Sequence, residues 1–110
     1  GGMQEAIERV QDYLKEMGKS LEMTVEVRDL EELELVMGYD SVNRVMLDNF
    51  SMEDMRIAVA RVDKKKEVEA SGGITLDVLK EVASTGVDFI SVGALTHSAP
   101  SLDLSLKVRK

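Results

Sequence analysis

Two carboxylates and two glycine-containing turns follow the predicted strands of this 110-residue chain, and together they suit the binding of a sugar phosphate. Glu26 and Asp48 lie near the ends of two β-type runs, and the turns at 71–74 and 91–94 follow the next two runs. Backbone N–H groups at a joint between a strand and a helix can hold a phosphate. Carboxylates beside it suit ribose hydroxyls, or an Mg²⁺ ion that the phosphates also contact.

Alternating helix and strand patterns would position these residues. The spacing of apolar residues predicts helices at 3–17 and 76–85 and a short helical turn at 94–97. Two further helices are predicted from their apolar faces, one with Leu30, Leu33 and Val36-Met37 and one with Met55, Ala58, Val59 and Val62. Strands are predicted at 23–27, 44–48, 67–70 and 88–92, followed by an amphipathic strand at 102–108. Asp29, Ser51 and Thr75 are the expected helix N-caps.

This order of elements predicts an α/β fold built from βα repeats around a parallel sheet with right-handed crossovers. Ligands of parallel α/β folds bind at the carboxyl ends of the strands. The two carboxylates and the two glycine turns should therefore lie along one rim of the sheet. No low-complexity linker divides the chain, and its length suits one domain or half of an α/β barrel.

The composition excludes several classes of function. A net charge of −7 argues against general nucleic-acid binding, which depends on Lys and Arg meeting phosphates. The absence of Cys excludes disulfides, thiolate metal sites and a Cys nucleophile, and it suits a reducing, cytoplasmic location. No apolar stretch is long enough to span a membrane.

Each candidate residue also has a simpler interpretation. Glu26 could pair with Lys or Arg on an exposed strand, and Asp48 could cap the helix that follows it. Paired glycines at 72–73 could form only a tight turn, and Gly93 alone carries little weight. His97, the single histidine, has no partner in the sequence that would support acid–base catalysis.

Several segments, in this order, resemble the carboxy-terminal part of the quinolinate phosphoribosyltransferase family, also called nicotinate-nucleotide pyrophosphorylase (carboxylating). The resemblance covers almost the whole chain and lies in segments 25–27, 30–33, 45–50, 69–76, 86–98 and 102–107. It implies a fold of about half of a (β/α) barrel of the type II phosphoribosyltransferase kind, spanning 1–110. The amino-terminal domain and early barrel strands of the family have no counterpart here.

The resemblance implies transfer of phosphoribosyl from phosphoribosyl pyrophosphate to quinolinate, with decarboxylation to nicotinate mononucleotide, in NAD synthesis. It implies Mg²⁺ with the phosphoribosyl pyrophosphate, and catalytic roles for Glu26 and Asp48 beside the ribose and pyrophosphate. The ligand-binding positions that it implies, which include both carboxylates and surround the 5′-phosphate, are Glu26, Asp48, Ser71, Gly72, Gly73, Gly93 and Ala94.

The family's Arg, Lys and His residues for the two carboxylates of quinolinate lie in the segments without a counterpart. We therefore expect a phosphoribosyl half-site that is inactive alone, and a chain that self-associates or pairs with a complementary barrel fragment. The alternative from a different class is a non-catalytic phosphate-binding or interaction module with an open parallel sheet.

Overall fold

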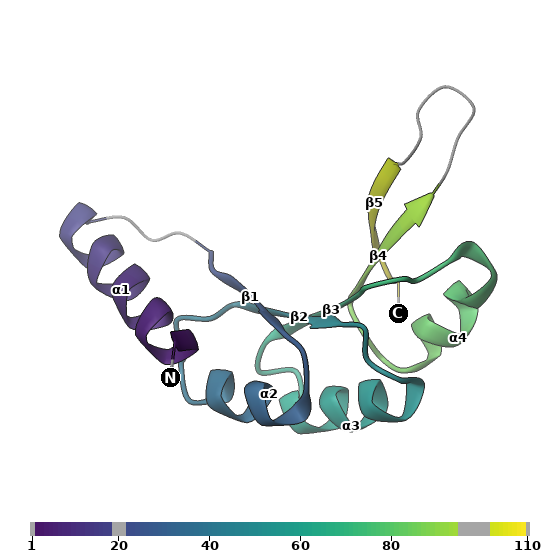
Figure 1. Ribbon diagram of the computed structural model, residues 1–110, viewed down its shortest axis with the longest axis horizontal. Helices are drawn as coiled ribbons and strands as arrows, with labels where there is room; N and C mark the ends of the chain where they lie inside the picture. The colour runs from purple at the N-terminus through teal and green to yellow at the C-terminus, as the bar shows by residue number, and fades with distance from the viewer. Residues whose placement is uncertain (1, 19–21, 95–101, 110) are drawn as a thin grey trace.

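The computed structural model describes residues 2–18, 22–94 and 102–109 as an open sheet with helices along one face and the first helix beside its first strand (Figure 1). Its helices are α1 (Gly2–Met17), α2 (Leu30–Met37), α3 (Met52–Val62), the 3₁₀ turn η1 (Leu76–Val78) and α4 (Leu79–Ser84). Its strands are β1 (Thr24–Val27), β2 (Arg44–Asp48), β3 (Glu67–Ser71), β4 (Phe89–Ala94) and β5 (Leu102–Lys107). The α/β class predicted from the sequence is confirmed.

The sheet has the order β1-β2-β3-β4-β5, so its strands follow one another as they do in the sequence. β1 to β4 run parallel, and β5 pairs antiparallel with β4. The predicted parallel sheet is therefore confirmed for β1 to β4, and the amphipathic strand predicted at 102–108, whose pairing the sequence did not indicate, joins it in the antiparallel direction. The β4–β5 hairpin projects from the end of the sheet (Figure 1).

The core lies between the sheet and the helices α2, α3 and α4, which all cover the same face (Figure 1). Val27, Leu47 and Ala70 stand opposite one another on β1, β2 and β3, and all three are fully buried. Because strand side chains alternate between faces, Glu26, Asp48 and their counterparts on the other strands lie on the face that no described helix covers. The Cα radius of gyration is 15.0 Å, against about 13 Å for a compact domain of this length.

Local capping signals were correct for two helices and wrong for a third. The Asp29 carboxylate accepts a hydrogen bond from the backbone N–H of Glu32, and the Ser51 hydroxyl accepts one from the backbone N–H of Asp54. Thr75 makes no side-chain cap, because its hydroxyl bonds the Asp77 carboxylate. The predicted helix at 76–85 is accordingly a 3₁₀ turn followed by six residues of α-helix.

Candidate functional site

The rim at the carboxyl ends of β2 and β3 brings Asp48 next to Ser71. The two residues stand opposite each other in the parallel register, and both side chains lie on the open face of the sheet. The backbone N–H of Asn49 donates a 2.9 Å hydrogen bond to the carbonyl of Ser71. Asn49 adopts a left-handed φ of 61°, a conformation that Asn tolerates better than most residues. The ends of β2 and β3 are therefore linked at the rim by a backbone hydrogen bond in addition to their register pairing.

Gly72 continues this link, and no larger residue fits there. Its φ is +86°, and a Cβ at this position would lie 2.5 Å from the Asn49 nitrogen and 2.6 Å from Asp48 Oδ1. Gly73 also has a left-handed φ, of +68°, but nothing lies within 4 Å of its Cβ position. Glycine is therefore favoured at the two positions for different reasons. At Gly72 the reason is the close approach of Asp48 and Asn49, and at Gly73 it is the left-handed backbone conformation.

Glu26 lies on the same open face, one step back from the rim. It stands opposite Met46, which is two residues before Asp48 on β2. Parallel register and alternation therefore place both predicted carboxylates on one face, but only Asp48 stands beside the Ser71–Gly73 turn, since β2 separates Glu26 from β3. Glu26 is exposed and Asp48 is partly buried, so ligand oxygens can reach both.

The second glycine turn predicted from the sequence does not form. Gly93 and Ala94 lie inside β4, where they pair with Asp103 and Leu102 of β5. The sequence pattern missed this because the antiparallel partner of β4 begins eight residues further along the chain. Ala94 is a strand residue rather than the start of the predicted helical turn at 94–97, and His97 lies outside the described residues.

Below the rim, the open face carries a charged cluster that sequence reasoning did not predict. The guanidinium of Arg44 lies 3.1 Å from Glu69 Oε1 and 3.2 Å from Glu67 Oε1. Its central carbon lies 3.7 Å from the ring centroid of Phe89. Glu69 is only 4% exposed, although no described helix covers this face. The signal in the sequence was the alternation that puts an Arg and two Glu on the open side of adjacent strands.

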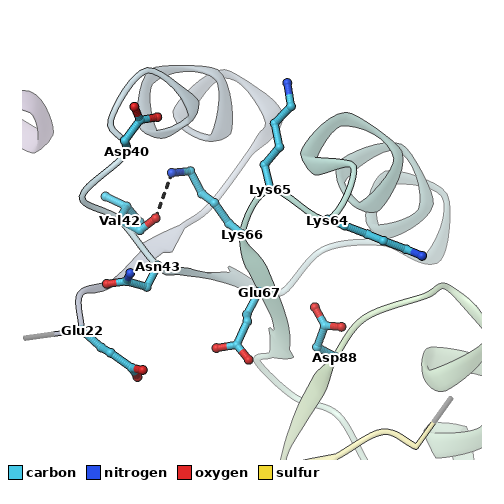
Figure 2. A pocket seen from close by; sticks show the side chains of 9 residues that line it. All are labelled: Glu22, Asp40, Val42, Asn43, Lys64, Lys65, Lys66, Glu67 and Asp88. Atoms are coloured by element: carbon cyan, nitrogen blue, oxygen red, sulfur yellow. Dashed lines mark hydrogen bonds between the residues drawn. The ribbon is translucent and has the colours of Figure 1, made fainter.

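A hollow of about 550 Å³ lies at the opposite end of the strands, near the amino ends of β2, β3 and β4 (Figure 2). Figure 2 shows Lys66 pointing toward Val42, whereas Lys64 and Lys65 extend away. The Lys66 ammonium donates hydrogen bonds to the carbonyls of Tyr39 and Val42, at 2.6 and 2.8 Å. Burial lowers the pKa of Lys66, and the charge of Asp40 partly offsets this. This lysine therefore joins β3 to the loop after α2.

The donor set fits an Mg²⁺ ion only in company with phosphates. No three Asp, Glu or His side chains among the described residues are grouped so as to hold a metal ion. Mg²⁺ is commonly held by one or two carboxylates plus substrate phosphates, rather than by an all-protein cage. Glu26 and Asp48 match the carboxylate share of such a site.

A mostly parallel sheet covered by helices, with carboxylates and a Ser-Gly-Gly turn at the carboxyl ends of its strands, defines the class as an α/β protein of the βα-repeat kind. The sequence model of the family described as quinolinate phosphoribosyl transferase, C-terminal domain, matches residues 1–107. This chain belongs to that family.

No helix in the described ranges has the length and apolar character needed to cross a bilayer.

Named relatives agree with this assignment. The chain is 38% identical over 122 residues to the chloroplastic nicotinate-nucleotide pyrophosphorylase [carboxylating] of Arabidopsis thaliana, covering 98% of this chain and 35% of the relative. It is 39% identical over 111 residues to the enzyme of that name from Rattus norvegicus, covering 98% and 36%. The solved nicotinate-nucleotide pyrophosphorylase of Francisella tularensis superposes with a TM-score of 0.74 at 39% identity, covering 99% of this chain and 38% of that one.

The Ehrlichia chaffeensis structure of the same name gives a TM-score of 0.76 at 28% identity, covering 93% of this chain and 36% of that one. The chain therefore spans about a third of the length of these relatives. The family predicted from the sequence is confirmed, and so is the fold, as the carboxy-terminal part of a type II phosphoribosyltransferase barrel.

Proposed function

We propose that this chain provides the phosphoribosyl half of a quinolinate phosphoribosyltransferase site, and that it does not catalyse the reaction alone. The contact of Asp48 and Asn49 with Gly72 supports the proposal most strongly. It sets a carboxylate directly beside the backbone of the glycine turn. A 5′-phosphate bound by the turn would then leave the attached ribose within reach of Asp48.

In this proposal each group has a distinct task. The amides of the Ser71–Gly73 turn hold the phosphate and fix the position of the sugar. Asp48 and Glu26 bond the ribose hydroxyls and stabilise positive charge that grows on the ribose carbon as pyrophosphate leaves. When Mg²⁺ is bound with phosphoribosyl pyrophosphate, it neutralises charge on the leaving pyrophosphate. Gly93 and Ala94 would approach the phosphate from β4.

The reason for inactivity is the charge of the open face. Across β1 to β4 this face carries Glu26, Asp48, Glu67 and Glu69, and its cations among the described residues are Arg44 and, opposite Phe89 on β5, Lys107. Arg44 is already paired with two of those carboxylates. The dicarboxylate quinolinate would meet net negative charge here. The cations that bind it must therefore come from another polypeptide segment, and we propose a complementary barrel fragment or a second copy as the partner.

Binding of ribose 5-phosphate, followed by amide NMR, tests the half-site. We expect shifts at Asn49, Gly72 and Gly73, and an affinity about tenfold lower in D48N, because a charge-assisted hydrogen bond is worth roughly 1.5–3 kcal/mol. D12N removes the same charge from the exposed side of α1 and should bind normally. Shifts confined to Lys64–Lys66 at the other end of the strands would refute the assignment.

A second assay tests inactivity. Incubation with quinolinate, phosphoribosyl pyrophosphate and Mg²⁺ should give no nicotinate mononucleotide, and appreciable product would contradict the proposal. A cytoplasmic location also stays a prediction, and some relatives carry chloroplastic or mitochondrial in their names.

A further inference from the structure

Arg44 connects three neighbouring strands on the open face. It begins β2, contacts Glu67 and Glu69 of β3, and lies over the ring of Phe89 at the start of β4. β3 lies between β2 and β4 in the sheet, so the guanidinium reaches across one strand to the next. A planar guanidinium can bond carboxylates and stack on an aromatic ring at the same time, which an ammonium cannot do as well.

Arg44 contacts residues of the shortest strand pairing in the parallel part of the sheet. β2 and β3 share five register pairs, whereas β3 and β4 share two, Glu69 with Phe89 and Ala70 with Ile90. Arg44 touches both members of the first pair. On its other side β4 pairs with β5 at all six of its residues, from Phe89 to Ala94. The placement of β4 beside β3 therefore depends on a short strand pairing, and Arg44 contacts residues on both sides of it.

This strand pairing lies immediately beneath the proposed phosphate site. Glu69 is two residues before Ser71 on β3, and Phe89 is two residues before Ser91 on β4, so all four side chains share the open face. We propose that Arg44 is a positioning residue that sets the distance between the Ser71–Gly73 turn and the Ser91–Gly93 segment. This inference rests on the proposed function, because it assigns Arg44 a task in building that phosphate site.

Two substitutions separate this role from general stability. R44K keeps the positive charge near Glu69 but removes the planar fork and its stacking on the ring. F89L removes the ring and keeps an apolar side chain on β4. R61K is the matched control, since Arg61 also forms an ion pair with a glutamate, Glu34, but does so between α3 and α2 on the helix side.

The readouts are the Kd of ribose 5-phosphate and the amide hydrogen exchange of 89–91. We expect R44K and F89L to weaken binding about tenfold and to speed exchange in β4, while R61K changes neither. Binding by R44K at the unmodified affinity would overturn this inference and leave the proposed function standing. Failure of the unmodified chain to bind ribose 5-phosphate would refute the proposed function and this inference together.

Discussion

Replacing Gly72 by alanine should destabilise the chain far more than the same replacement at Gly73. Both glycines have left-handed φ angles, +86° and +68°, so an L-residue at either position costs about 1–2 kcal/mol from its backbone conformation alone. The two sites differ in their surroundings. Open space surrounds the Cβ position at Gly73, whereas the Asn49 nitrogen lies 2.5 Å from that position at Gly72.

The additional cost at Gly72 follows from this contact. Ordinary contacts begin near 3.4 Å, so the Asn49 backbone would have to move by about 0.9 Å. That movement disturbs the 2.9 Å hydrogen bond from the Asn49 N–H to the Ser71 carbonyl, which is worth about 1 kcal/mol. With the conformational cost, we expect G72A to lose about 2–3 kcal/mol and G73A about 1–2 kcal/mol. A typical domain has about 5–15 kcal/mol of stability in total.

Urea denaturation followed by circular dichroism measures this difference. Slopes near 1–3 kcal/mol per M make a gap of about 1 kcal/mol visible as separated midpoints. Equal midpoints for G72A and G73A, within about 0.5 kcal/mol, would show that the close approach of Asp48-Asn49 to Gly72 does not limit the turn. The assignment of Asp48 to the rim beside the turn would then lose its main support.

Three further predictions concern other parts of the molecule. D29A should cost about 1 kcal/mol in the same urea experiment and T75A much less, because Asp29 caps its helix with its side chain and Thr75 does not; equal losses would contradict the caps described here. K66M should cost about 1–3 kcal/mol by leaving two carbonyls without their donor. Burial lowers the pKa of Lys66 in the folded chain, so at a pH just below the ordinary pKa of 10.5 the Lys66 side chain holds more protons in the unfolded chain than in the folded one. The stability of the unmodified chain relative to K66M should therefore rise as the pH approaches 10.5. A fall in this relative stability would refute the direction of the pKa change. Sedimentation should show that the unmodified chain self-associates and that Y13E weakens the association, because Tyr13 is 61% exposed on an apolar stripe of α1. A strictly monomeric unmodified chain would argue against a partner on this surface.

Long-range pairing explains the features that the sequence prediction missed. Gly93 looked like a turn because it follows an apolar run, but its pairing with Asp103 extends the strand. The Arg44 cluster depends on register, since the residues it contacts are 23 to 45 positions away in sequence. Such contacts depend on which strands become neighbours, and a single sequence does not state this.

What the sequence determined by itself was local or repetitive. The order of helices and strands follows from apolar periodicity, and the caps at Asp29 and Ser51 follow from hydrogen bonds that span three residues. The family followed from residue strings that the comparison with known proteins confirms. Only the tertiary structure decided that Asp48 touches the backbone of the glycine turn, that β5 runs antiparallel, and that Arg44 contacts residues on both sides of the pairing between β3 and β4. The reason is physical: periodicity and capping act within one element, whereas these contacts exist only after separate strands have taken their register.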